Sequence, residues 1–153
     1  MKKIFSAILL SLCTLAFSHS AIAASDKGSA DEAVALVKKA VAYIKANGKE
    51  KAFAEFNNPG GSFKDRDLYI FAMEMNGVMS AHGVNPKLIG KNLSGLKDVD
   101  DKQFIKSFIE TANSKGKGWV DYKWPNPTTK AVEAKSTYIE KADELVVGCG
   151  IYK

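Results

Sequence analysis

Three large aromatic side chains lie close together in one segment of the chain: Trp119, Tyr122 and Trp124. The alternation of a β-strand puts Tyr122 and Trp124 on one face of this segment and Trp119 on the other. The next predicted strand carries Lys135 and Tyr138 on its two opposite faces. Rings with polar tips and an ammonium group within reach of one another can hold a small organic molecule, but the same residues also suit an aromatic core beside a solvated lysine.

Two further residues have reactive side chains, His82 and Cys149. His82 follows a predicted strand and precedes Gly83, where it can donate a hydrogen bond to a ligand or cap a turn. No second titratable group stands at a spacing that implies acid–base catalysis with it. Cys149 lies in the apolar stretch 147–151, where burial raises the pKa of a thiol and lowers its reactivity. The residues therefore favour binding over catalysis, and Cys149 is predicted to be a core residue.

One acidic cluster, residues 98–101, is a candidate for metal binding. An EF-hand loop that began at Asp98 would need glycine at its sixth position and glutamate at its twelfth, where the chain has Gln103 and Ile109. We interpret the cluster as a helix start, because carboxylates are stabilised by the positive end of the helix dipole. No metal site is predicted.

The first residues have the pattern of a secretory signal peptide. Lys2 and Lys3 precede an apolar stretch, residues 4–17, and Ala21-Ile22-Ala23 is a suitable cleavage site. Cleavage after Ala23 leaves residues 24–153 as a single domain, predicted to be periplasmic or secreted. An uncleaved leader kept as an anchor is the alternative, although its apolar run is shorter than a typical membrane span. Loss of the two lysines lowers the formal charge from +5 to +3, which does not suggest nucleic-acid binding.

The leader also contains one of the two cysteines and one of the two histidines, Cys13 and His19. The processed chain then keeps one cysteine and one histidine, which excludes a disulfide or a zinc site within one chain. No cofactor is predicted. Lipidation of Cys13 is not favoured, because Leu12 stands where the processing enzyme needs a small residue.

Hydrophobic periodicity predicts a long first helix and a shorter second one. The first begins with a capping box at Ser29 and Glu32, presents an apolar stripe, and ends at Asn47-Gly48. The second presents Ala52, Phe53 and Phe56 on one side and ends at the turn-forming residues 57–61.

After the second helix, apolar side chains recur at every second residue, which predicts β-strands, except in one loop and a third helix. Strands are predicted at 68–75 and 78–82, joined by an Asn76-Gly77 hairpin turn, and at 119–124, 132–141 and 145–152. The loop covers residues 83–98, and a capping box at Asp100 and Gln103 opens a helix that ends at Gly116. The fold class is therefore α+β, with a five-stranded antiparallel sheet.

At these residues the sequence resembles a single Cache domain, the PAS-like extracellular sensor domain of bacterial chemoreceptors and histidine kinases. The resemblance covers roughly residues 30–153. It rests on five segments in order: 67–71, 80–83 with Asn85-Pro86 and 90–93 downstream, 118–125, 135–138 and 148–152.

The resemblance implies a PAS-like fold with the long N-terminal helix on one face of the sheet and a ligand pocket under the loop and third helix on the other. Family members bind small organic acids, so the implied ligand is a carboxylate. Tyr122, Lys135 and His82 are the preferred contacts, because a carboxylate needs donors in a mostly apolar site. The full implied lining is Tyr69, Met73, His82, Trp119, Tyr122, Trp124, Lys135 and Tyr138.

Sensor members of the family continue into a membrane helix and a signalling domain, whereas this sequence ends after the last strand. We therefore expect a periplasmic binding or sensing module without its own output domain, and not an enzyme. A membrane receptor or kinase is the expected partner, and a homodimer through the N-terminal helix is a further expectation.

Three alternatives remain open from the sequence. Trp119, Tyr122 and Trp124 also suit an aromatic box for a quaternary amine, with Lys135 turned out to water. A ligand-free interaction module would dock on a membrane receptor through an exposed apolar face of the first helix. An exported hydrolase would need a carboxylate or hydroxyl within about 3 Å of His82.

Overall fold

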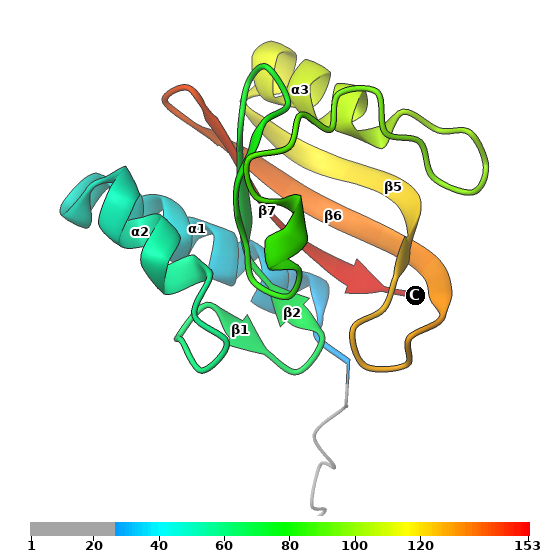
Figure 1. Cartoon of the computed structure of the whole chain (residues 1–153), viewed down its shortest axis with the longest axis horizontal. Helices are drawn as coiled ribbons and strands as arrows, with labels where there is room; N and C mark the ends of the chain where they lie inside the picture. Colours follow the sequence, from blue (N-terminus) through cyan, green and yellow to red (C-terminus); the bar gives the residue numbers. More distant parts are fainter. Residues whose placement is uncertain (1–26) are drawn as a thin grey trace, which may run out of the picture.

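The computed structural model describes residues 27–153, and Figure 1 shows their arrangement. The predicted leader and its cleavage site lie outside these described residues. The helical elements and strands follow one another in this order: α1 (Ala30–Asn47), α2 (Lys49–Phe56), β1 (Lys64–Asp65), β2 (Leu68–Tyr69), β3 (Phe71–Glu74), β4 (Met79–His82), η1 (Pro86–Leu88), α3 (Phe104–Lys115), β5 (Lys117–Pro125), β6 (Val132–Ala142) and β7 (Leu145–Tyr152).

Helix α1 has the boundaries that its sequence signals predict. The side chain of Ser29 accepts from the backbone N–H of Glu32, and the Glu32 carboxylate accepts from the backbone N–H of Ser29. This reciprocal capping box satisfies two N–H groups that an α-helix leaves unpaired at its start. Gly48 ends the helix with φ of 80°, a conformation that favours glycine.

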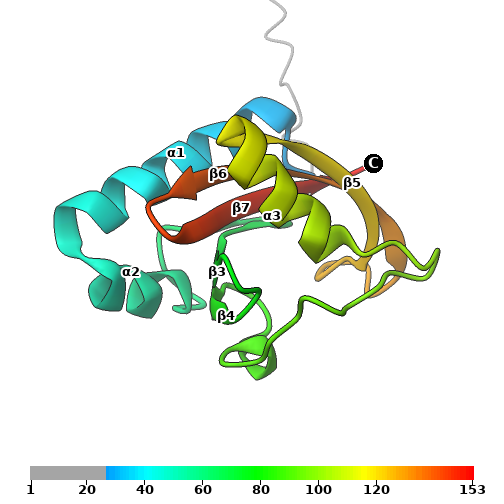
Figure 2. The ribbon, with the colours of Figure 1, turned by 90° about the horizontal axis from the view of Figure 1, so that it is seen from above.

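The five-stranded sheet is antiparallel, as predicted, and its strand order is β4-β3-β7-β6-β5. Helix α1 covers one face, which we call the α1 face, and α3 with the connecting segment 83–103 covers the other, which we call the α3 face. Figure 2 shows α1 and the connecting segment on opposite sides of the sheet. Each face has its own apolar core, because side chains of each strand alternate between the two faces.

The stretch predicted as one strand, residues 68–75, is divided in two. Leu68 and Tyr69 form β2 and pair with β1 in a small hairpin, whereas Phe71–Glu74 pairs with β4 and β7 as β3. Between them, the Ile70 N–H donates to Phe63 (3.2 Å) and the Ile70 carbonyl accepts from Gly83 (3.0 Å). Side chains keep alternating between the two faces of the sheet across this break, with Leu68, Ile70 and Ala72 on one face and Phe71 and Met73 on the other. The sequence pattern therefore gives no sign that the strand is divided.

The predicted capping box of the third helix is wrong. Helix α3 begins only at Phe104, and its N-cap residue, Gln103, makes no side-chain cap hydrogen bond. Asp98 instead orders the preceding loop, since its carboxylate accepts from the backbone N–H groups of Asp100, Lys102 and Lys123, each at 2.9 Å. The acidic cluster therefore ties the connecting segment to β5 rather than starting a helix. The predicted end of this helix, at Gly116, is confirmed.

Within residues 27–153, no helix has the length and hydropathy needed to cross a membrane.

Candidate functional site

A row of three residues in register crosses the α3 face of the sheet: Tyr122 on β5, Lys135 on β6 and Tyr152 on β7. Lys135 is only 2% exposed. Its ammonium donates to the hydroxyl of Tyr69 (2.8 Å) and to that of Tyr152 (3.0 Å). It also lies 4.2 Å from the centroid of the Tyr69 ring and 4.4 Å from that of Tyr152, within range of a cation–π contact. The lysine is therefore turned into the protein.

The ammonium of Lys135 lacks a counter-ion in the described part of the chain: no carboxylate there lies within ion-pair distance of it. Burial lowers the pKa of Lys135 to about 7, because an ammonium loses its hydration there. Two of its three N–H groups are used by the tyrosine hydroxyls, and the third is left for another acceptor. An anion in contact with this group would stabilise its charged form.

Gly150 makes room for this lysine. It lies on β7 beside β6, and a Cβ atom at this position would stand 2.2 Å from Cε of Lys135 and 2.3 Å from Oγ1 of Thr137. Contacts that short do not occur between real side chains. The absence of a side chain at Gly150 is therefore what lets Lys135 lie flat against the sheet under the tyrosine rings.

A narrow cavity adjoins these residues on the α3 face. Its free volume is about 20 Å³, room for about one water molecule. The lining combines strand residues, leucines of the connecting segment and the apolar face of α3. Its members are Tyr69, Phe71, Met79, His82, Leu88, Leu93, Leu96, Phe104, Ile105, Phe108, Tyr122 and Trp124.

Aromatic stacking fixes one wall of the cavity. The rings of Phe104 and Tyr122 are stacked, with centroids 4.3 Å apart and planes 8° apart. Phe108 meets Tyr122 edge-on at 5.4 Å, and Trp124 meets Phe104 at 5.4 Å. The Tyr122 hydroxyl lies 3.1 Å from that of Thr137, and burial raises the pKa of Tyr122 well above its usual value. The phenol therefore remains neutral and able to donate.

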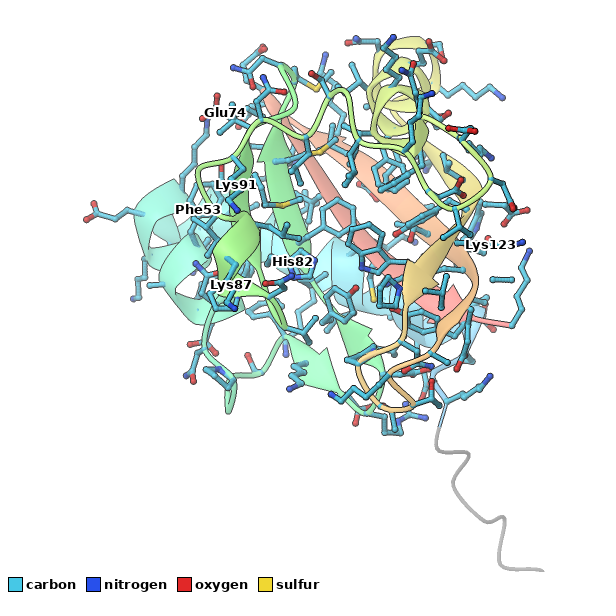
Figure 3. All side chains as sticks on the ribbon, turned by 45° about the vertical axis from the view of Figure 1, so that its right-hand side comes forward. Phe53, Glu74, His82, Lys87, Lys91 and Lys123 are labelled. Atoms are coloured by element: carbon cyan, nitrogen blue, oxygen red, sulfur yellow. The ribbon has the colours of Figure 1, made fainter. Side chains whose placement is uncertain are left out.

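His82 borders the cavity at the end of β4, and Figure 3 shows it in the middle of this side of the molecule. Its Nδ1 accepts from the backbone N–H groups of Asn85 (3.1 Å) and Val84 (3.4 Å), so the neutral ring carries its proton on Nε2. Burial and, second, the positive charge of Lys135 lower the pKa of His82 to about 4. At neutral pH, His82 is thus a neutral Nε2–H donor.

Half of the predicted site residues line the cavity: Tyr69, His82, Tyr122 and Trp124. Lys135 does not line it, but its ammonium is bonded to the Tyr69 hydroxyl.

Three predicted site residues lie away from the cavity. Met73 is buried deeper in the core of the α3 face and does not line the cavity. Trp119 and Tyr138 are neighbours on the α1 face, with ring centroids 5.5 Å apart, and Trp119 is 40% exposed. Strand alternation requires this separation, because Trp119 is three residues from Tyr122 and five from Trp124, and side chains an odd number of residues apart lie on opposite faces.

The cavity also includes residues that sequence reasoning did not assign to the site. Phe104 and Phe108 lie within the predicted third helix, but no sequence signal placed them beside Tyr122. Leu88, Leu93 and Leu96 come from the predicted loop. Three leucines within nine residues of an otherwise mostly polar loop were the signal that this segment covers an apolar surface.

The geometry does not favour the alternatives that the sequence left open. Trp119 lies on the opposite face of the sheet from Tyr122 and Trp124, so the three rings cannot form one amine box. Cys149 is fully buried in the core of the α1 face, and burial raises its pKa to about 12. His82 has backbone N–H groups, not a carboxylate or hydroxyl, as its hydrogen-bond partners within residues 27–153.

Docking through an exposed apolar face of α1 also lacks support from the described residues. The large apolar side chains with the greatest exposure are Ile89, Val99, Trp119 and Val132, and α1 contains none of them.

Solved structures with the same fold include chemotaxis proteins and chemosensory domains. A methyl-accepting chemotaxis protein of Vibrio parahaemolyticus is 29% identical, with a TM-score of 0.70 over 80% of this chain and 86% of that one. The periplasmic sensor domain of a chemotaxis protein is 25% identical, with a TM-score of 0.64 over 80% and 88%. A Cache chemosensory domain described for its carboxylic acid recognition has the same fold at 24% identity, with a TM-score of 0.67 over 80% and 91%.

Two curated proteins match part of the chain. The methyl-accepting chemotaxis protein McpP of Pseudomonas putida is 31% identical over 90 residues, 58% of this chain and 16% of that protein. The sensor histidine kinase MctS of Rhizobium johnstonii is 32% identical over 89 residues, 57% of this chain and 19% of that protein. The chain spans less than a fifth of the length of each of these relatives.

The family comparison agrees with the fold and covers nearly the whole chain. The model of single Cache domain 2 matches residues 14–153. This chain therefore belongs to the single Cache domain 2 family.

Proposed function

We propose that this domain binds the carboxylate of a small organic acid in the cavity on the α3 face. The observation that carries the proposal is the buried ammonium of Lys135, which has two phenol partners and no carboxylate partner in the described chain. A buried charge without a carboxylate in direct contact is costly, and a bound anion reduces that cost. The ligand would therefore complete the site.

Each group at the cavity has a role in this proposal. The hydroxyls of Tyr69 and Tyr122 and the Nε2–H of His82 donate to the carboxylate, while Lys135 supplies the charge through direct contact or through Tyr69. The apolar side chains of α3 and the connecting segment enclose the carbon chain. A cavity with room for about one water is smaller than any organic acid, so binding requires the connecting segment or α3 to move outward.

The size of the ligand limits its affinity. A ligand gains at most about 1.5 kcal/mol per heavy atom, so a four-atom acid reaches about 6 kcal/mol, a Kd of tens of micromolar. Affinity much tighter than that would indicate a larger acid.

The proposed biological role is sensing. Cache domains are extracellular or periplasmic sensor domains, and the relatives are a chemoreceptor and a sensor kinase. One solved relative with this fold recognises carboxylic acids. We propose that this domain is exported and reports acid binding to a membrane receptor or kinase.

Calorimetric titration tests the binding proposal. Acetate, propionate, lactate and pyruvate are titrated against the domain, with propionamide as a neutral match for propionate. We expect heat of binding from at least one acid, none from the amide, and loss of that heat in Lys135→Met. The control is Lys38→Met, which removes an exposed lysine from α1 on the opposite face of the sheet. Negligible heats from every acid, or binding unchanged by Lys135→Met, would overturn the proposal.

A further inference from the structure

Two hollows in the surface adjoin the cavity at His82. One has a volume of about 230 Å³ and the other about 240 Å³, and both are lined by His82, Val84, Pro127 and Lys130. We call the two together the outer hollow. His82 also lines the narrow inner cavity, so the outer hollow and the inner cavity meet at the imidazole ring.

The outer hollow is positively charged. Lys64 of β1 and Lys130 of the turn between β5 and β6 line it, and no carboxylate lines either half. Glu133, farther along the chain, is engaged elsewhere: its carboxylate accepts from the side chains of Asn126 (3.0 Å) and Thr129. The charge that a solute meets in this hollow therefore comes from two ammonium groups.

Local structure holds both lysines at the outer hollow. Lys64 stands directly opposite Tyr69 in the β1–β2 pair. Lys130 has φ of 64°, its N–H donates to the Asn126 carbonyl (2.9 Å), and its ammonium donates to the Pro127 carbonyl (2.6 Å). Proline has a fixed φ, so Pro127 stiffens the turn that carries Lys130.

A neutral donor adds to the two charges. Asn57 lines the hollow and uses its side-chain oxygen to accept from the backbone N–H of His82 (2.9 Å), which leaves its amide NH₂ available. Donors without competing acceptors are what an anionic group needs.

We infer that the outer hollow is a second anion subsite, which takes the distal charged group of an acid whose first carboxylate lies in the inner cavity. The preferred ligand class is then a small dicarboxylate rather than a monocarboxylate. This inference rests on the proposed function for the inner cavity, and it adds Lys64 and Lys130 as the residues that determine specificity.

Matched ligands test the second subsite. Succinate and its monomethyl ester differ only in the distal charge, and propionate serves as the monocarboxylate. In calorimetry we expect succinate to bind about fivefold or more tightly than the ester, as two partly solvated charges allow. The double variant Lys64→Gln/Lys130→Gln should remove this preference and leave propionate unchanged, whereas Lys38→Gln/Lys45→Gln on α1 should preserve it. Equal binding of succinate and ester, or propionate weakened as much as succinate, would overturn the inference.

A second measurement does not depend on the inner cavity. Inorganic phosphate is titrated into the Lys135→Met variant and followed by NMR of the backbone amides of Val84 and Lys130. We expect saturable shifts of both amides, which the double lysine variant abolishes. If phosphate shifts neither amide signal, the inference of an outer subsite is wrong, even if propionate binding requires Lys135. If phosphate shifts both amide signals but Lys135→Met leaves propionate binding unchanged, the proposed function is wrong and the outer anion site is retained.

Discussion

The ammonium of Lys135 donates to the hydroxyl of Tyr152, the residue directly opposite it on the neighbouring strand, at 3.0 Å. The Tyr152 hydroxyl in turn donates to the Pro125 carbonyl (2.9 Å). A cationic group bonded only to neutral hydroxyls is retained at a cost in stability. This relationship supports the proposal that the lysine serves binding rather than folding.

The substitution Lys135→Met separates these two roles. Methionine has a similar length and no charge to bury, so we expect the free energy of unfolding at pH 7 to stay the same or rise. Acid binding should fall at least tenfold, because a hydrogen bond to a charged group contributes about 1.5–3 kcal/mol. Chemical denaturation and calorimetry measure the two quantities. A large loss of stability with binding retained would contradict this account.

Gly150→Ala tests the space that Lys135 occupies. The added methyl would stand 2.2 Å from Cε of Lys135, and overpacking of this kind costs about 1–3 kcal/mol. We expect both stability and acid binding to fall, as the lysine is displaced. Gly95→Ala is the matched control, since a Cβ there meets nothing within 4 Å. Equal stability of the two variants would count against the packing argument.

Stability should rise between pH 7 and pH 9 because of Lys135. Its pKa is about 7 in the folded protein and near 10.5 when exposed, so the unfolded chain binds more protons throughout this interval. The slope is at most about 1.4 kcal/mol per pH unit for one proton. Above pH 9 the buried Cys149, with a pKa of about 12, acts in the opposite direction. Urea denaturation across this range should show the slope, and Lys135→Met should flatten it.

His82 governs a separate interval at lower pH. Its pKa is about 4 in the folded protein against a usual 6.5, so stability should fall as the pH decreases from 6.5 toward 4. Carboxylates with lowered pKa, such as that of Glu32, add to the loss only at still lower pH. His82→Gln should remove the slope between pH 6.5 and 4.5. An unchanged slope in this variant would show that another group is responsible.

The buried carboxylate of Asp67 should stabilise the start of α1. It accepts from the backbone N–H of Gly28 at 2.6 Å, and its other oxygen has no hydrogen-bond partner in the described structure. Asp67→Ala leaves the Gly28 N–H unsatisfied, which costs about 1–3 kcal/mol. Asp65→Ala, two residues away and solvent-exposed, is the control and should change stability less. Thermal unfolding of the two variants provides the comparison.

Local sequence signals predicted the helices and strands because their causes are local. The capping box at Ser29, the Asn76-Gly77 turn and the alternation of β5 to β7 each depend on a few consecutive residues. The break after Tyr69 and the late start of α3 depend on partners far along the chain. Asp98, for example, binds the backbone of Lys123 on β5, and no spacing rule connects these two residues.

Only part of the candidate site could be predicted, because some of its contacts join residues that are far apart in the sequence. Strand alternation groups Tyr122 with Trp124 and separates Trp119, but it does not say which face a helix covers. The contact of Lys135 with Tyr69 joins residues 66 positions apart, so only the folded chain brings them together.

Proton uptake on ligand binding tests the central claim, that an acid supplies the counter-ion of the Lys135 ammonium. The calorimetric titration with an acid that binds is repeated at pH 8 and pH 6, each time in buffers of different ionisation enthalpy. At pH 8 most Lys135 side chains are neutral, so we expect uptake approaching one proton per acid bound, close to none at pH 6, and none in Lys135→Met at either pH. Acid binding at pH 8 without proton uptake would contradict the claim.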